Sequence, residues 1–127
     1  MADGSSKRLN LLIVDDSALM RALLRRAASL SRVPLGAIYE AGNGEEALRL
    51  LETTSIDAVF TDLNMPVMTG FELLEVMRRD ERWRSLLRVV ISAGASAAPD
   101  TESLGSTQFV EKPFRPEAIR DALASLL

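Results

Sequence analysis

The sequence predicts an α/β fold, namely a doubly wound, five-stranded parallel sheet with helices on both faces. Short apolar runs alternate with segments of helical periodicity almost without a gap from residue 9 to residue 127. The chain has 127 residues, 47% of them hydrophobic, which suits one domain with a substantial core. Strands that alternate with helices in so short a chain require right-handed crossover connections, and these make the sheet parallel.

The first two strand and helix pairs follow from apolar runs and capping residues. An apolar run precedes the acidic pair Asp15 and Asp16, and the residues after the pair are apolar near helical spacing, namely Leu19, Leu23, Leu24, Ala27 and Leu30. Pro34 and Gly36 predict the turn into the second strand. These patterns place strands at 9–14 and 37–40 and helices at 17–30, capped by Asp16 or Ser17, and at 44–53, capped by Asn43.

The remaining elements are predicted in the same way. A third apolar run ends at Asp62, and Thr69 is the expected N-cap of the helix that begins at Gly70. The predicted strands cover 56–61, 88–92 and 107–110, and the predicted helices cover 70–79 and 117–127, with Pro116 near the start of the last. Residues 93–106 are rich in Ala, Ser and Gly, so only about one helical turn, at 99–104, is expected there.

The composition excludes several classes of function. The chain has no cysteine and no histidine, which rules out thiolate nucleophiles, a Ser-His-Asp triad and imidazole or thiolate metal sites. A net charge of −3 argues against nucleic-acid binding, and Arg21, Arg25 and Arg26 are interpreted as a solvated helix face. Residues 1–8 are interpreted as a disordered polar tail, no segment is long and apolar enough for a membrane span, and a cytoplasmic location is expected.

Polar side chains follow the predicted strands at one edge of the sheet. Asp15 and Asp16 follow the first strand, and Asp62 follows the third. Since the carboxyl ends of parallel strands open into one crevice, these acids are expected to lie close together. Ser92, at the end of the fourth strand, and Lys112, just past the fifth, would join them. A hard, oxygen-liganded cation such as Mg2+, with Mn2+ as an alternative ion, is the natural match for such a site.

Each of these residues also has a purely structural interpretation. Asp15 or Asp16 taken alone is more often a helix N-cap, and Asp62 could begin an Asx-turn. Ser92 could merely end a strand, and Lys112 could be an ordinary surface lysine. The joint arrangement favours a functional site, because strand ends converge at this edge and buried charges need partners.

Five segments together resemble response-regulator receiver domains, in particular the single-domain regulators of chemotaxis type. They are LLIVDDSALMR, AGNGEEAL, DAVFTDLNMPVMTGFELL, RVVISA and QFVEKPF, in this order. The resemblance implies a flavodoxin-like sheet with the strand order 2-1-3-4-5 and a receiver domain over residues 9–127. Residues 93–106 depart from the family pattern, so the fourth helix of the family, between the last two strands, is expected to be short or irregular here.

The resemblance implies a phosphoacceptor switch of a two-component or phosphorelay pathway. Asp62 would accept the phosphoryl group, while Lys112 and the Ser92 hydroxyl would contact the phosphoryl oxygens. Ser92 and Phe109 would then act as the switch that changes partner binding, although Phe109 is interpreted equally well as a plain core aromatic.

The resemblance also assigns the metal ligands. Asp16, Asp62 and the backbone carbonyl of Asn64 would bind Mg2+. Asp15 would act through water or as a supporting charge behind those ligands.

The implied phosphodonor is a histidine kinase or a histidine phosphotransfer protein, which must act in trans because the chain has no histidine. The target would be a further protein of unknown identity, with no nucleic acid or membrane involved, and a monomer or weak dimer is expected. The chain would not be an enzyme, beyond assisting its own phosphorylation and dephosphorylation. The alternative is a receiver-fold scaffold that acts without phosphorylation. A Mg2+-dependent phosphohydrolase fits less well, because such enzymes place an acid two residues after the nucleophile and Ser17 stands there.

Overall fold

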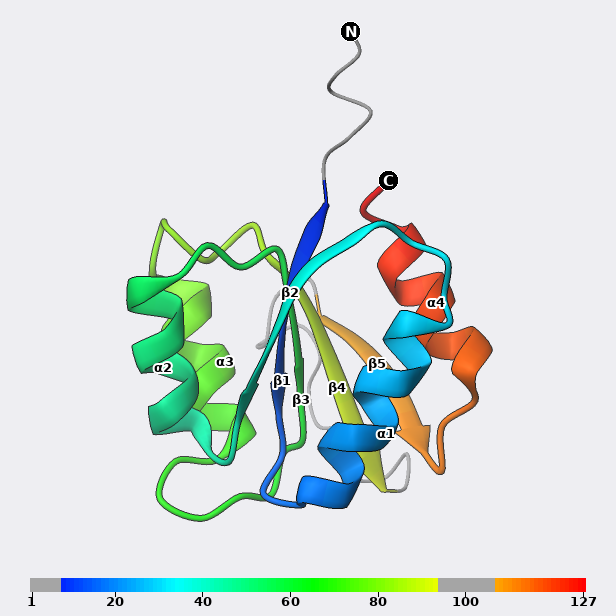
Figure 1. The fold of residues 1–127 in the computed structure, drawn as a ribbon. Coiled ribbons are helices and arrows are strands. Elements are labelled where there is room, and N and C mark those ends of the chain that lie inside the picture. Colours follow the sequence, from blue (N-terminus) through cyan, green and yellow to red (C-terminus); the bar gives the residue numbers. More distant parts are fainter. Residues whose placement is uncertain (1–7, 94–106) are drawn as a thin grey trace, which may run out of the picture.

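The computed structural model describes residues 8–93 and 107–127. The helical turn expected at 99–104, and with it the predicted character of the fourth helix of the family, lies outside the described residues, as does the expected tail except for the exposed Arg8. None of the helices in the described part of the chain is long and apolar enough to cross a membrane. The elements, drawn in Figure 1, are β1 (Leu9–Val14), α1 (Ala18–Ser29), β2 (Leu35–Ala41), α2 (Gly44–Thr53), β3 (Ala58–Thr61), α3 (Gly70–Arg79), β4 (Leu87–Ala93), β5 (Thr107–Lys112) and α4 (Pro116–Ala124).

The strands form one parallel sheet in the order β2-β1-β3-β4-β5, which confirms the predicted doubly wound arrangement. Val14 lies opposite Thr61 where β1 meets β3, and Thr61 lies opposite Val90 where β3 meets β4. The carboxyl ends of the strands therefore lie along a common edge, the lower edge in Figure 1.

Two layers of helices enclose the sheet. Helices α1 and α4 cover one face, and α2 and α3 cover the other (Figure 1). Successive side chains of a strand point to opposite faces, so Leu11 and Ile13 belong to the core under α1 and α4, whereas Leu12 and Val14 belong to the core under α2 and α3. Each such fully buried side chain contributes roughly 1.5–3 kcal/mol through its removal from water. The two cores hold the strand ends, and hence the site, in fixed positions.

Helix caps determine where the first three helices begin. The side chains of Ser17, Asn43 and Thr69 each accept a hydrogen bond from a backbone N–H in the first turn. Ser17, and not Asp16, is thus the cap of α1. Glu72 returns a bond to the backbone of Thr69, which completes a reciprocal capping box. These three helices begin at the edge where the strands end, so the caps also fix the loops around that edge.

The second strand is longer than predicted. β2 begins at Leu35, so Gly36 lies inside the strand and not in a turn. A Cβ at position 36 would lie 2.3 Å from Oδ1 of Asn10, so any larger residue there would require the Asn10 side chain to shift. As an edge strand, β2 is largely exposed or half-buried and lacks the continuous apolar run that marks the central strands.

The apolar stripe predicted for the first helix is only partly buried. Leu24 is 1% exposed, whereas Leu19 is 70%, Leu23 is 44% and Leu30 is 63% exposed. Three of the five apolar residues at helical spacing are therefore not part of the core. The periodicity identified the helix, and α1 packs on the sheet along the narrower face formed by Leu24, Ala27 and Ala28.

Candidate functional site

The three predicted acids lie together at the carboxyl edge of the sheet. Asp15 directly follows β1, Asp62 directly follows β3, and the backbone N–H of Asp62 donates to the carbonyl of Val14 at 3.0 Å. One carboxylate oxygen from each of Asp15, Asp16 and Asp62 lies within 4.8 Å of the others. The neighbouring strands β1 and β3 end at the same height in the sheet, so the acids that follow them form one cluster.

The acids differ in exposure and in anchoring. Asp15 is 1% exposed, Asp62 is half-buried and Asp16 is exposed. Oδ1 of Asp15 accepts the N–H of Ser17 at 2.9 Å, and Oδ1 of Asp62 accepts the N–H of Leu63 at 2.7 Å. The backbone therefore holds one oxygen of each of the two less exposed carboxylates, while the carboxylate of Asp16 faces solvent.

Lys112 joins the two less exposed acids. Its Nζ lies 3.2 Å from Oδ2 of Asp15 and 3.2 Å from Oδ2 of Asp62. Burial of the ammonium would lower the pKa of Lys112, but the attraction of the two carboxylates outweighs burial and raises that pKa above its usual value. Lys112 is therefore a cation at neutral pH. The charge of this ammonium offsets part of the mutual repulsion of the three carboxylates at this edge.

The donor set fits a hard divalent cation. In the described residues one ammonium faces three carboxylates, so negative charge is in excess, and every donor in the cluster is an oxygen. Mg2+ takes oxygen ligands at about 2.1 Å, which places them about 3–4 Å apart. Since the carboxylate oxygens already lie within 4.8 Å of one another, shifts of about 1 Å would suffice to bind the ion.

The loop between β3 and α3 folds back against the backbone of Asp62 and Leu63. Asn64 is exposed, two positions after Asp62 in this loop. The N–H of Gly70 donates to the carbonyl of Leu63 at 2.9 Å, which closes the loop. A Cβ at position 70 would lie 2.0 Å from the carbonyl oxygen of Asp62, so this approach admits only glycine.

The same loop contains a strained turn at Val67. The residue has φ of +68°, and the N–H of Met68 donates to the carbonyl of Pro66 at 2.7 Å, which makes a γ-turn centred on Val67. A β-branched residue with positive φ is an outlier and costs about 1–2 kcal/mol. The Val67 side chain is 75% exposed, so no burial offsets this cost locally.

Replacing Val67 with glycine is expected to stabilise the protein by about 1 kcal/mol, because glycine adopts positive φ freely. Val67→Ala should give a smaller gain, since alanine removes the β-branch but keeps the Cβ. Urea unfolding monitored by circular dichroism measures both differences. A Val67→Gly protein less stable than the wild type would show that the turn is not strained.

Ser92 and Phe109 lie on the two strands beyond β3. Ser92 is 6% exposed and lies on β4 two positions beyond Val90, which is paired with Thr61. It is thus near the edge at which Asp62 follows β3. Phe109 on β5 is half-buried and packs against a small cluster formed by Leu63, Leu74, Val90 and Phe71. The aromatic residue therefore shares a cluster with Leu63, the neighbour of Asp62.

Arg21 also belongs to the site, although the sequence placed it on a solvated helix face. Its Nη1 donates to the backbone carbonyl of Asp15 at 2.6 Å, and its Nε donates to Oε1 of Glu40 at 2.9 Å. Helical side chains tilt toward the N-terminus of their helix, so a long side chain one turn after Ser17 can reach the end of the preceding strand. The spacing of one helical turn between Ser17 and Arg21 was the one sequence feature that could have indicated this contact.

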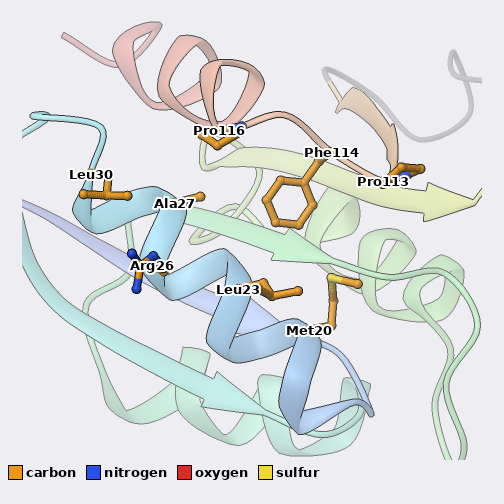
Figure 2. A pocket seen from close by; sticks show the side chains of 8 residues that line it. All are labelled: Met20, Leu23, Arg26, Ala27, Leu30, Pro113, Phe114 and Pro116. Atoms are coloured by element: carbon orange, nitrogen blue, oxygen red, sulfur yellow. The ribbon is translucent and has the colours of Figure 1, made fainter.

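An apolar pocket of about 260 Å³ lies between α1 and the connection from β5 to α4 (Figure 2). Figure 2 shows the ring of Phe114 turned toward α1. No acid lines the pocket, so it is distinct from the acidic cluster. Its lining comprises Met20, Leu23, Arg26, Ala27, Leu30, Pro113, Phe114 and Pro116. The sequence did not predict this pocket.

Comparisons with known proteins agree with this architecture. The model of the response regulator receiver domain matches residues 11–124. Chemotaxis protein CheY1 of Helicobacter pylori is 32% identical over 122 residues, covering 94% of this chain and 97% of that protein. Chemotaxis protein CheY of Pseudomonas aeruginosa is 32% identical over 120 residues, covering 93% of this chain and 95% of that protein.

Solved structures extend the agreement to three dimensions. The chemotaxis response regulator CheY4 of Vibrio cholerae superposes with a TM-score of 0.82 at 27% identity, covering 95% of this chain and all of that one. The predicted resemblance is confirmed by sequence and by fold. The chain belongs to the response regulator receiver domain family of two-component signalling proteins.

Proposed function

We propose that the chain is a phosphoacceptor switch in which Asp62 accepts a phosphoryl group from a phosphohistidine of a partner protein. Membership of the receiver family supports the general role. The observation that carries the assignment to Asp62 is its position: the carboxylate is half-buried, 3.2 Å from the ammonium of Lys112, and within 4.8 Å of two further acids. Asp15 is 1% exposed, which leaves its carboxylate less accessible to a phosphodonor than the half-buried carboxylate of Asp62.

The proposed step is a transfer between two nucleophiles. A carboxylate oxygen of Asp62 attacks the phosphorus, the bond from phosphorus to the imidazole nitrogen breaks, and its electron pair returns to the imidazole of the donor. The product is an acyl phosphate on Asp62. Since the sequence has no histidine, the phosphohistidine lies outside it, and the proposed donor is a histidine kinase or a histidine phosphotransfer protein.

The residues around Asp62 suit the charge that this step creates. Phosphoryl transfer spreads negative charge over three equatorial oxygens, and catalysis consists mainly of positioning and neutralising them. The ammonium of Lys112 and the hydroxyl of Ser92 would contact phosphoryl oxygens. When bound, Mg2+ would neutralise further charge. Asp16, Asp62 and the backbone carbonyl of Asn64 would hold the ion, and Asp15 would be the buried supporting charge.

The proposed output is a change of partner binding through Ser92 and Phe109. A hydroxyl that moves toward the phosphoryl group would vacate space beside β5. Phe109 already packs against the cluster that contains Leu63, which follows Asp62 directly, so we expect a small shift at the site to reach this ring. We propose that a second protein reads the change, that the chain acts in the cytoplasm as a monomer or weak dimer, and that its only catalysis concerns its own phosphorylation and dephosphorylation.

Intact-mass spectrometry after exposure to acetyl phosphate tests the proposal. With Mg2+ the wild type is expected to gain the mass of one phosphoryl group, and with EDTA in place of Mg2+ it should gain little. Asp62→Ala should show no gain in either condition. The matched control is Asp121→Ala, which removes a carboxylate on α4 that is 71% exposed and should leave the adduct unchanged.

Two outcomes would count against the proposal. An adduct that persists in Asp62→Ala would place the phosphoacceptor elsewhere. The lack of an adduct in the wild type under any condition, even with a histidine kinase supplied, would favour a receiver-fold scaffold that acts without phosphorylation.

A further inference from the structure

Arg21 connects the acidic cluster to the neighbouring edge strand. Its side chain is 21% exposed, and its guanidinium bridges two groups, the backbone carbonyl of Asp15 at 2.6 Å and Oε1 of Glu40 at 2.9 Å. Asp15 follows β1, Glu40 lies on β2, and Arg21 itself lies on α1. Figure 1 shows that α1 begins at the edge where β1 and β2 end. One side chain therefore fixes three elements relative to one another at the site.

The group that Arg21 contacts lies at the centre of the acidic pair. The carbonyl of Asp15 is part of the peptide that joins Asp15 to Asp16. Because a peptide is planar, fixing this carbonyl fixes the direction in which the chain enters Asp16. Asp15 is also held by its own N–H, which donates to the carbonyl of Ala41, and by its side-chain contacts. Asp16 is exposed, so its carboxylate depends on the orientation of this peptide.

Glu40 holds the guanidinium in place. Its burial would raise the pKa of the Glu40 carboxyl, but hydrogen bonds from Arg21 and Arg25 outweigh burial and lower that pKa. Glu40 is therefore an anion at neutral pH. Arg25 binds the other oxygen of the same carboxylate at 2.9 Å and donates to the carbonyl of Ile38 at 3.0 Å. Arg25 thus shares the ion pair with Glu40 but does not contact Asp15.

We infer that Arg21 is a positioning residue of the metal site, which orients the peptide between Asp15 and Asp16 so that Asp16 presents its carboxylate to the cation. This inference rests on the proposed function, in which Asp16 binds Mg2+. The guanidinium also occupies the carbonyl of Asp15, so this oxygen does not compete with the carboxylates for the ion. Side chains that orient metal ligands from behind typically change metal affinity by about 10–100-fold when they are removed.

Isothermal titration calorimetry with MgCl2, on wild type, Arg21→Met, Arg25→Met and Arg21→Lys, tests the inference. Arg21→Met is expected to weaken Mg2+ binding by about tenfold or more. Arg25→Met should bind like the wild type, and Arg21→Lys should restore part of the affinity, because an ammonium can still donate to a carbonyl. Both methionine variants lose an ion pair to Glu40, so Arg25→Met controls for that loss.

Phosphorylation by acetyl phosphate supplies a second readout. In Arg21→Met the Mg2+ concentration that gives half the maximal rate should rise by about the same factor as the dissociation constant, while the maximal rate at saturating Mg2+ stays close to that of the wild type. A variant that was merely less stable would not show this separation, provided that urea unfolding confirms that it is folded at the assay temperature.

The possible outcomes separate this inference from the function on which it rests. Unchanged Mg2+ affinity in Arg21→Met, or an equal loss in Arg25→Met, would overturn the positioning role and leave the proposed function intact. A wild type that neither binds Mg2+ nor gains a phosphoryl group would overturn both.

Discussion

Replacing Lys112 with methionine is expected to destabilise the metal-free protein by about 3 kcal/mol. Methionine keeps most of the apolar stem but removes the ammonium that lies 3.2 Å from both Asp15 and Asp62. Asp15 is 1% exposed, so its carboxylate would remain buried beside that of Asp62 without a cation. Equilibrium unfolding in urea, with EDTA present, measures the loss.

Mg2+ should restore more stability to Lys112→Met than to the wild type. The variant has a larger excess of negative charge at the site, and a ligand that binds only the folded state stabilises it by mass action. The control is Arg120→Met, which removes a basic side chain that is 52% exposed and paired with exposed Asp121. Its stability should change by less than about 1 kcal/mol, with or without Mg2+. A Lys112→Met protein as stable as the wild type in EDTA would contradict the pairing described above.

The pH dependence of this difference has a defined sign. The carboxylates raise the pKa of Lys112 above its ordinary value of 10.5, so the stabilisation is complete below that value. It is lost only as the pH rises through the higher value of the folded state. The gap between wild type and Lys112→Met should therefore stay constant from about pH 7 to pH 9 and shrink only in stronger base.

Replacing Gly70 with alanine is expected to destabilise the protein by about 2–4 kcal/mol and to reduce phosphorylation at the same time. The new Cβ would lie 2.0 Å from the carbonyl oxygen of Asp62 and 2.9 Å from the Cα of Leu63. Both are backbone atoms next to the proposed phosphoacceptor, so relief of the clash must move the backbone that carries its carboxylate. The carbonyl of Asp62 also accepts a hydrogen bond from Oγ1 of Thr61 at 2.8 Å, which such a movement would strain.

Gly42→Ala is the matched control for this variant. A Cβ at position 42 would meet its nearest atom, Oε1 of Glu46, at 3.6 Å, an ordinary contact. Urea unfolding and the acetyl phosphate assay should therefore give values close to those of the wild type. If Gly70→Ala proved equally benign, the close approach between α3 and the end of β3 would not constrain the site.

The sequence was sufficient to predict the parallel sheet, its strand order by family resemblance, and the residues that meet at its carboxyl edge. The central strands are recognisable because burial on both faces makes them continuous apolar runs, as in the segment that ends at Val14. The acids that follow these strands are then brought together by topology alone. Capping followed from local chemistry, since Asn43 and Thr69 satisfy N–H groups within one turn of themselves.

Features that depend on tertiary packing were harder to predict from the sequence. The limits of β2 were missed because an edge strand alternates between core and solvent, and Gly36 looked like a turn residue. Leu23 and Leu30 match the helical period but lie beyond the buried face of α1. Arg21 was grouped with solvated arginines because its partner is a backbone carbonyl, which has no signature in the sequence, and because Glu40 is distant along the chain.

The pairing of Lys112 with Asp15 has a consequence for the timing of signalling during synthesis. The two residues are 97 positions apart, and β5 is the last strand of the sheet along the chain. The acids of β1 and β3 leave the ribosome long before their cation does, because the chain is made from its N-terminus. A nascent chain that lacks β5 therefore has carboxylates without their ammonium. Competence to receive a phosphoryl group would arise only when translation has passed residue 112 and the final strand has docked.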